Sequence, residues 1–208
     1  MRGRDQYLLE QTYDKMYEST SNRILIPRRA GEERLAKQRA VYQKYVQEYI
    51  KNGSKGDLDL RRAIDFTLPD GLTVDGKLSL FSSLITKLPN KLHVTGSLIL
   101  SFSVLTELPN DIIVGGSLHM YQAKITTIPK SMTVIEEDVF ADYSLLTNVP
   151  DGFTVKGHLS LNNTSIENLP TNLQVGEELS LKFTPLAKKY NAKALKQMFK
   201  GVKGKIVV

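Results

Sequence analysis

Three histidines and one cluster of acids are the residues of this chain whose types are common in catalytic and metal sites. His93, His119 and His158 lie far apart, and none has a Cys, His or carboxylate partner at the spacing of a metal-ligand pair. The chain contains no Cys, which excludes thiolate ligands and a thiol nucleophile. The motifs of zinc peptidases, phosphate-binding loops and serine hydrolases do not occur. We therefore expect no enzymatic activity, no cofactor and no metal, and we interpret the acids Glu136, Glu137 and Asp138 as a solvated turn.

A short unit repeats through most of the chain and determines where the other residues lie. It reads L-x-L-x-x-S-x-L-x-x-L-P over residues 98–109. The prolines that close successive units are 20, 20, 20, 21 and 20 residues apart, and they are Pro69, Pro89, Pro109, Pro129, Pro150 and Pro170. A fixed short period of this kind predicts a solenoid of stacked coils.

Two alternating apolar triplets in each unit predict two short strands per coil. In one unit the triplets are Leu92-x-Val94 and Leu98-x-Leu100, and alternation places both members of a triplet on the same face. A single coil cannot bury its apolar face, so the coils must stack on one another. In this unit we expect six residues to face inward: Leu88, Leu92, Val94, Leu98, Leu100 and Leu105.

Two units depart from this regular pattern. Residues 134–139 (V-I-E-E-D-V) include one residue more than the neighbouring units and lack their Gly. An extra residue beside a strand indicates a bulge, so we expect the solenoid to bend or to differ locally here. The first coil, which begins at Gly56, also fits poorly because Asp65 occupies an expected core position between Ile64 and Phe66.

The repeat resembles the leucine-rich repeat, whose frame is L-x-L-x-x-N-x-L-x-x-L-P. The resemblance covers about residues 56–187. In leucine-rich repeats the Asn satisfies backbone groups of the turn, whereas here its position is taken by Ser83, Ser103, Ala123, Ser144, Thr164 and Thr184. With its L-P-x-x-L-x-V-x-G segments, the chain is also similar to short leucine-rich-like proteins of tailed bacteriophages. A more distant likeness is to the secreted leucine-rich effectors of enteric bacteria.

The resemblance and the repeat together imply a mainly β repeat solenoid of parallel strands. We expect a helical N-terminal cap or docking segment over residues 1–55, the solenoid over 56–187, and a closing segment over 188–208. Within them we predict helices over residues 5–20, 32–51 and 192–200 and a closing strand over 204–208. Asn191 is suited to cap the last of these helices.

The outward residues of the L-x-L strands include many aromatic rings, which folding does not require. Leucine-rich repeats present this row on their concave face, so the resemblance implies a binding surface there. Rings among small hydroxyl residues with few charges match the composition of an interface core. An alternative is that the rings fold over the coil edges or are covered by the N-terminal helices. The predicted contact residues are Phe81, Ile99, Phe102, His119, Tyr121, Phe140, Asp142, Tyr143, His158 and Phe183.

From this surface we expect a non-enzymatic protein-interaction module, and the resemblance implies that it is phage-encoded and binds a host or phage protein. The first residues contain no secretory signal, and no run of about 18 apolar residues occurs. We therefore expect a cytoplasmic protein that does not enter the membrane. The sequence carries no indication of the oligomeric state.

The charges are distributed unevenly and suggest two other functions. Residues 1–62 carry a net charge of +5, residues 63–181 carry −7 and residues 182–208 carry +8. One alternative is a nucleic-acid-associated protein that uses its basic ends. The other is a virion or assembly component that docks through its N-terminal helices. The possible basic contact residues form a row on the last predicted helix: Lys189, Lys193, Lys196 and Lys200.

Overall fold

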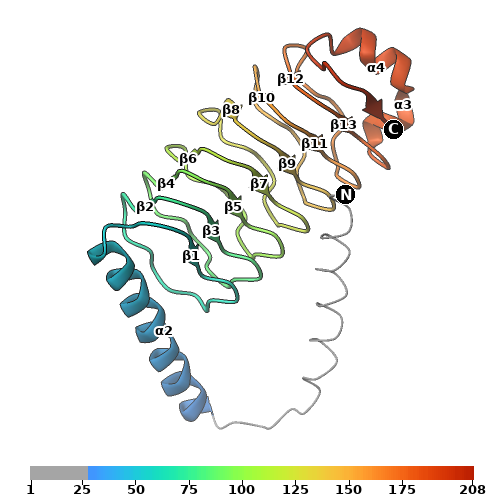
Figure 1. The fold of residues 1–208 in the computed structure, drawn as a ribbon. Coiled ribbons are helices and arrows are strands. Elements are labelled where there is room, and N and C mark those ends of the chain that lie inside the picture. Colours follow the sequence, from blue (N-terminus) through green and yellow to red (C-terminus); the bar gives the residue numbers. More distant parts are fainter. Residues whose placement is uncertain (1–27) are drawn as a thin grey trace, which may run out of the picture. The chain divides into compact units, whose positions relative to one another are not determined.

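The computed structural model describes residues 28–208. The chain divides into two compact units, residues 1–37 and residues 38–208, and the boundary falls inside helix α2 (Arg28–Lys51). The second unit is a parallel β-solenoid of stacked coils, which confirms the predicted fold class (Figure 1). The helix predicted over 32–51 is confirmed and begins earlier, at Arg28. The helix predicted over residues 5–20 lies outside the described residues.

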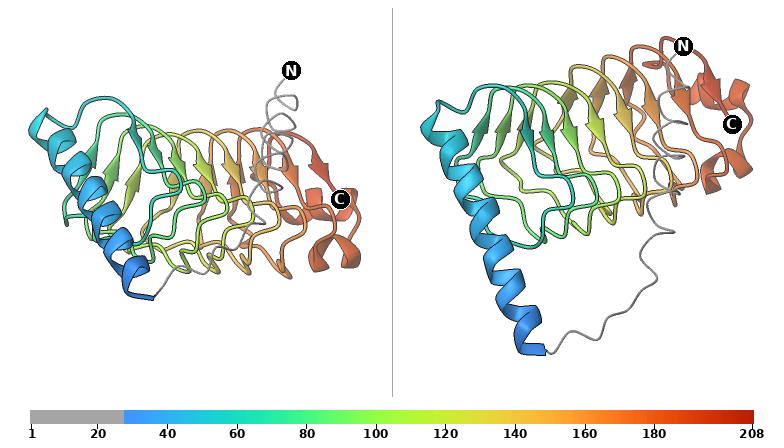
Figure 2. Two further views of the ribbon diagram at one scale, coloured as in Figure 1. Left: turned by 90° about the horizontal axis from the view of Figure 1, so that it is seen from below. Right: turned by 60° about the horizontal axis from the view of Figure 1, so that its bottom comes forward.

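Eight short strands, one from each coil, form a continuous parallel sheet that we call the long sheet. Its register follows the leucine repeat, since Leu98 lies opposite Leu78 on one side and Leu118 on the other. Figure 2 shows these strands side by side along the stack. In sheet order they are β1 (Leu58–Asp59), β3 (Leu78–Ser79), β5 (Leu98–Ile99), β7 (Leu118–His119), β9 (Val139–Phe140), β11 (Leu159–Ser160), β13 (Leu179–Ser180) and β14 (Ile206–Val207).

A second strand in most coils belongs to one of two three-stranded parallel sheets, which we call the short sheets. The first short sheet contains β2 (Thr73–Val74), β4 (His93–Val94) and β6 (Ile113–Val114). The second contains β8 (Val134–Ile135), β10 (Thr154–Val155) and β12 (Gln174–Val175). Two short strands per coil were predicted, and this is confirmed.

The core consists of columns of apolar side chains from equivalent positions in successive coils. All six residues predicted to face inward in the coil of β4 and β5 are buried, and Leu98, Leu100 and Leu105 have no exposed surface. They belong to one continuous hydrophobic cluster that runs through the stack. Because enclosing a leucine contributes about 1.5–3 kcal/mol, these columns supply the main stabilisation of the solenoid.

The turn after each long-sheet strand is closed by the backbone rather than by an Asn side chain. The N–H of Ser103 donates to the carbonyl oxygen three residues earlier (3.1 Å), and the N–H of Ala123 makes the equivalent bond (3.0 Å). Ser144 adds a second bond from its hydroxyl to the same type of carbonyl (2.7 Å). Among the described residues, the buried hydroxyls of Ser83 and Ser103 have no hydrogen-bond partner. The turn therefore forms without the Asn of leucine-rich repeats.

The short sheets are separated between β6 and β8, in the coil that the sequence marked as irregular. Thr133 and Val134 are both exposed and separate the buried Met132 from the buried Ile135, whereas the neighbouring coils have one residue at this place. The predicted local irregularity is confirmed. The irregularity lies slightly earlier in the chain than predicted. The extra residue lies at the start of β8, between Met132 and Ile135, and not among the acids that follow β8.

Close stacking of the coils does not by itself explain this interruption. A Cβ on Gly96 would lie 2.8 Å from the carbonyl oxygen of Gly76, so the stacking is tight in this column. Glu137 takes the place of a glycine here, but Glu177 does so as well, and its N–H still donates to the carbonyl of Gly157 (3.1 Å) while β12 pairs with β10. The loss of pairing between β6 and β8 therefore coincides with the inserted residue, while the long sheet continues unbroken from β7 to β9.

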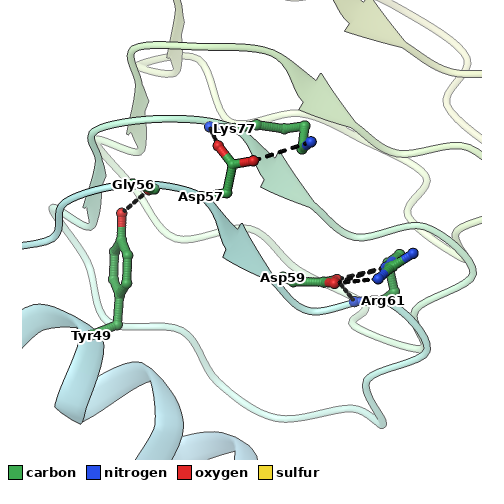
Figure 3. A network of polar contacts seen from close by, with 6 residues as sticks. All are labelled: Tyr49, Gly56, Asp57, Asp59, Arg61 and Lys77. Carbon is green, nitrogen blue, oxygen red and sulfur yellow. Dashed lines mark hydrogen bonds and ion pairs between the residues drawn. The ribbon is translucent and has the colours of Figure 1, made fainter.

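The C-terminal half of α2 covers the first coil. Val46 is buried, and the ring of Tyr42 stacks on Phe66 with 5.7 Å between the centroids. The hydroxyl of Tyr49 lies 2.7 Å from the carbonyl oxygen of Gly56 (Figure 3). Burial raises the pKa of the Tyr49 hydroxyl, so it remains a donor at neutral pH. This part of α2 thus acts as a cap for the irregular first coil.

Two exposed ion pairs lie beside β1 in the first coil (Figure 3). Asp57 accepts a hydrogen bond from the backbone N–H of Lys77 (2.8 Å) and pairs with its ammonium (3.1 Å). These contacts lower the pKa of the Asp57 carboxyl. The Asp59 carboxylate binds the guanidinium of Arg61 (2.6 Å). This contact likewise lowers the pKa of the Asp59 carboxyl. All four side chains are exposed, so these pairs contribute little to stability.

Three elements close the opposite end of the solenoid. Helix α3 (Pro185–Lys189) was not predicted, although Thr184 before a Pro is a recognisable helix start. Helix α4 (Ala192–Met198) was predicted and ends slightly earlier than expected, and Asn191 caps it by accepting from a backbone N–H (2.9 Å). Strand β14 extends the long sheet beside β13, which confirms the predicted closing strand.

We expect removal of the inserted residue to join the two short sheets. Deleting Thr133 together with Glu137→Gly restores the regular coil, so β6 and β8 acquire hydrogen bonds and the free energy of unfolding rises by about 1 kcal/mol. Hydrogen exchange should show slower amides over residues 134–136. Deletion of Thr154, which removes a regular residue, is the control and should lower stability. Unchanged exchange in the repaired coil would contradict this account of the interruption.

Candidate functional site

Four aromatic rings on the face of the long sheet contact one another in a row across four successive coils. Phe81 and Phe102 meet at 5.4 Å between centroids, Phe102 and Tyr121 at 5.2 Å, and Tyr121 and Tyr143 at 5.5 Å. We call this row the aromatic ladder. Since aromatic pairs at such distances attract one another by about 0.5–1.5 kcal/mol, the ladder holds its own side chains in place.

The ladder alternates between two positions in the repeat. Phe81 and Tyr121 directly follow the buried residues Leu80 and Met120, whereas Phe102 and Tyr143 lie one position further along their coils. Stacking in strict register keeps the two positions side by side, so rings from alternate coils interleave. This arrangement follows from the hydrogen bonds between neighbouring coils, such as that from the N–H of Phe102 to the carbonyl of Tyr121 (2.9 Å).

The outer position of the ladder has a left-handed backbone. Phe102 and Tyr143 both have a φ of 59°, and Phe183 has a φ of 61°. A bulky residue in this conformation costs about 1–2 kcal/mol, and Gly or Asn would be favoured there. Tyr143 is 52% exposed and Phe183 is 72% exposed, so core packing does not explain the rings at these two positions, whereas Phe102 is half-buried.

A second row of larger side chains lies beside the ladder on the same face. Ile99, His119 and Phe140 are half-buried in successive strands of the long sheet, and the rings of His119 and Phe140 are 5.2 Å apart. Desolvation by burial lowers the pKa of His119 from its ordinary value of 6.5, against the opposing influence of Asp138 and Glu137. This imidazole is therefore neutral at pH 7 and adds to the uncharged surface.

Polar residues replace the rings toward the C-terminal end of this face. Asp142 is buried, and its carboxylate accepts hydrogen bonds from the hydroxyl of Ser160 and the N–H of Asn162, each 2.7 Å long. The side chain of Asn162 repeats the pattern on the next coil, accepting from Ser180 (2.8 Å). Asp142, which the sequence indicated as a contact residue, thus has structural partners within the solenoid.

The other predicted contact residues beyond the ladder lie apart from it. His158 contacts the carboxylate of Glu177 (2.5 Å), and its backbone N–H donates to Asp138 (2.8 Å). Phe183 lies two coils beyond Tyr143. The structure therefore brings together seven of the ten predicted residues: Phe81, Ile99, Phe102, His119, Tyr121, Phe140 and Tyr143.

Two exposed leucines near the ladder were missed by the sequence reasoning. Leu84 is 52% exposed and Leu145 is 55% exposed, and each follows a residue of the outer position by two places. In the leucine-rich frame the position between the buried hydroxyl residue and the next buried apolar residue is variable. The sequence could have indicated these exposed leucines, because the same position of another coil carries a charged residue, Lys124, and therefore faces outward.

The row of lysines near the C-terminus is only partly available for contacts. The ammonium of Lys196 binds the carbonyl oxygens of Val202, Lys203 (3.3 Å) and Gly204 (2.5 Å) in the closing turn. It therefore satisfies backbone groups that would otherwise be left at the last coil.

The remaining lysines of the predicted row lie in different elements. Lys189 lies in α3 and is 3.9 Å from the carboxylate of Glu167. Lys193 and Lys200 are exposed, one within α4 and one just after it.

Comparisons with family models, with curated proteins and with solved structures found no match. In the part of the chain that the structure describes, no group of three or more His, Asp or Glu side chains is placed to hold a metal ion. Within residues 28–208, no helix has the length and apolar character needed to cross a bilayer. The aromatic face therefore stands as the candidate functional site on its geometry alone.

We expect the His119 imidazole to titrate below pH 6.5, because burial disfavours its charged form. The unfolded chain then binds the proton more readily, so stability is complete above pH 6.5 and falls as the pH decreases below that value. Imidazole C–H resonances followed by NMR over pH 4–8 measure the midpoint directly. His119→Gln should remove this part of the pH dependence of unfolding. A midpoint at or above 6.5 would contradict burial as the dominant influence on the pKa of this imidazole.

Replacing Lys196 should weaken the closing coil. In Lys196→Met the three carbonyl oxygens lose a charged donor, and we expect the free energy of unfolding to fall by about 1–2 kcal/mol in urea titrations. Lys193→Met is the matched control, with an expected change within about 0.5 kcal/mol. Equal effects of the two substitutions would mean that Lys196 has no capping role.

Proposed function

We propose that this chain is a non-enzymatic protein-interaction module that binds its partner through the aromatic face of the long sheet. The observation that supports the proposal is the aromatic ladder, together with its neighbours Ile99, His119 and Phe140. Tyr143 is exposed and the other three rings are half-buried, and apolar side chains gathered on one face of a folded domain often mark a binding site. Rings packed side by side and largely free of charges are also typical of the residues that dominate binding energy at interfaces.

The backbone conformation adds a second line of support. Rings at Phe102 and Tyr143 occupy left-handed positions at a conformational cost, while Asn163 occupies the same position in a later coil without that cost. The left-handed conformation itself recurs at this position in every coil from Arg62 to Phe183, so it belongs to the repeat. Only the choice of a ring at Phe102 and Tyr143 needs a further reason, and we attribute that choice to contacts with another molecule.

The leucine-rich-like frame bears on the proposed partner. Because the repeat resembles short proteins of tailed bacteriophages, we propose that the chain is phage-encoded and acts inside the host cell. The partner is then a host or phage protein. This part of the proposal depends on the repeat frame alone and is independent of the geometry of the ladder.

The two alternative functions have less support. Nucleic-acid binding through the C-terminal lysines is disfavoured because Lys196 binds backbone carbonyls and Lys189 lies near Glu167. The solenoid between the basic ends carries a net charge of −7 over residues 63–181, which repels a phosphate backbone. Docking in a virion would use the N-terminal helices, and of these the helix predicted over residues 5–20 lies outside the described residues.

Glycine substitutions at the outer position provide a sharp test. Phe102→Gly with Tyr143→Gly removes two rings of the ladder, and relief of the left-handed backbone offsets the lost ring contacts. We therefore expect the free energy of unfolding to change by no more than about 1 kcal/mol. Affinity capture from a lysate of the organism that carries the gene, quantified by mass spectrometry, should lose its main partner with this variant.

The matched control is Gln122→Gly with Asn163→Gly. These residues have φ values of 50° and 56° in the same column, so the backbone change is the same and no ring is lost. Capture by the control should equal capture by the unmodified protein. If the ring-deleted variant captures the same partner equally well, the aromatic face is not the binding site.

A further inference from the structure

Helix α2 ends in a backbone motif that favours a glycine. The N–H of Gly53 donates to the carbonyl oxygen of Ile50, and the N–H of Ser54 donates to that of Tyr49, both at 3.0 Å. These two bonds form a Schellman motif, in which the residue after the helix cap adopts the left-handed conformation. Gly53 has a φ of 85°, which a residue with a side chain adopts only at a cost. Because Asn52 precedes this glycine, the helix end contains an Asn-Gly pair.

An Asn-Gly pair is a sequence in which an asparagine side chain can react with the backbone beside it. The backbone nitrogen of the second residue attacks the side-chain amide carbon of the first, and a glycine leaves that nitrogen open to close approach. No heavy atom lies within 4 Å of the place where a Cβ on Gly53 would stand, and Asn52 is exposed. Asn52 is the only asparagine in the chain that a glycine follows.

Other acidic residues that precede a glycine lie in turns where contacts between coils restrain the reacting groups. Both oxygens of the Asp70 carboxylate accept hydrogen bonds from Asn90 (2.8 and 3.3 Å), and the N–H of Gly71 donates to the carbonyl of the same Asn90 (2.8 Å). The N–H of Gly152 donates to the side-chain oxygen of Asn172 (2.9 Å). These turns are held in place by the next coil.

The Asn-Gly pair of α2 is restrained by one bond of the helix end. The bond from the Gly53 N–H to Ile50 must open before the nitrogen can attack, and the ends of a helix open more readily than its interior. Within residues 28–208, the side chain of Asn52 has no hydrogen-bond partner that would hold it away from this nitrogen. Opening of the last helical turn is therefore enough to bring the two groups together.

We propose that Asn52 is a site of spontaneous modification, at which the Asn-Gly pair rearranges to a β-linked aspartate. The Gly53 nitrogen loses its proton and forms a bond to the side-chain carbon of Asn52, and the amide nitrogen leaves as ammonia. The product is a cyclic imide, which water opens. Attack of water at the backbone carbonyl leaves the chain linked through the side-chain carbon, and attack at the other carbonyl gives ordinary aspartate. Water is the only co-reactant.

The β-linked product alters the junction between α2 and the first coil. It adds one carbon to the backbone between Asn52 and Gly53, so the two bonds of the Schellman motif cannot both keep their present geometry. The Tyr49 hydroxyl reaches across this junction to the carbonyl oxygens of Ser54 (2.6 Å) and Gly56 (2.7 Å, Figure 3). We therefore expect the product to weaken the cap of the first coil. This inference is independent of the aromatic face and goes beyond the proposed function.

Incubation of the full chain at 37 °C, followed by peptide mapping with mass spectrometry, tests the modification. The peptide that contains Asn52 should gain the mass of an acid in place of an amide, in two products that separate by chromatography. Because the attacking nitrogen must lose its proton, conversion should be faster at pH 8.5 than at pH 7. Asn90, Asn110 and Asn172, which precede Lys, Asp and Leu, are the internal controls and should remain unmodified over the same time. Asn52→Gln should abolish the products.

A synthetic peptide of residues 47–58 measures the reaction without the fold. If this peptide converts and the full chain keeps its amide at Asn52 over the same time, the helix end protects the residue and the proposal is wrong. Reaction at one of the control asparagines before Asn52 would also overturn it.

Hydrogen exchange on the purified β-linked product tests the effect on the cap. The amides of Ser54 and Asp75, which donate to the Tyr49 and Ser54 carbonyls, should exchange about fivefold faster than in the unmodified chain, the effect of losing roughly one hydrogen bond. Freshly prepared Asn52→Asp is the matched control, since it adds the charge without the extra backbone carbon. Equal exchange in the product and in this control would show that the cap tolerates the β-linkage, and the proposed loosening would be wrong.

Discussion

The structure depends on one constraint, the hydrogen-bonded register that places each residue directly over its equivalent in the next coil. The N–H of Leu98 donates to the carbonyl of Ser117, and the N–H of Leu118 donates to that of Asp138, both at 2.9 Å. Because this register runs the length of the long sheet, every position of the repeat becomes a column. The leucine columns fill the core, and the outward columns form the surface. A ring in one coil therefore meets whatever the neighbouring coils carry at the adjacent positions.

Departures from the register are as informative as the register itself. The residue inserted at 133–134 coincides with the break between the two short sheets. The solenoid tolerates the interruption because only the short sheets separate, while the long sheet keeps its pairing. The aromatic ladder crosses this point without a gap, since Tyr121 and Tyr143 lie in the coils on either side of it. The integrity of the aromatic face thus depends on the long sheet alone.

Most of the fold could be predicted because one period determined it. Repetition of the leucines identified the strands, the inward residues and even the closing strand at β14, where Ile206 takes the place of a leucine. Contacts between distant segments could not be predicted in this way. The capping bonds of Tyr49 and Lys196 depend on how a helix meets a coil, and no local pattern encodes that meeting. Asp142 was predicted as a contact residue because its position faces outward. In the structure it is buried, and its carboxylate accepts hydrogen bonds from the next coil.

The candidate site was predicted in part for the same reason. Outward rings could be assigned to one face from the alternation of each strand, but the left-handed turn that carries Phe102 beside Tyr121 is a property of the folded coil. The central claim is that these rings touch one another and remain accessible to another molecule. Aromatic-proton NMR in the presence of a soluble paramagnetic agent tests it most directly. The account predicts nuclear Overhauser effects between the rings of Phe102 and Tyr121 and strong broadening of Tyr143. Rings without mutual contacts, or rings that the agent does not reach, would contradict it.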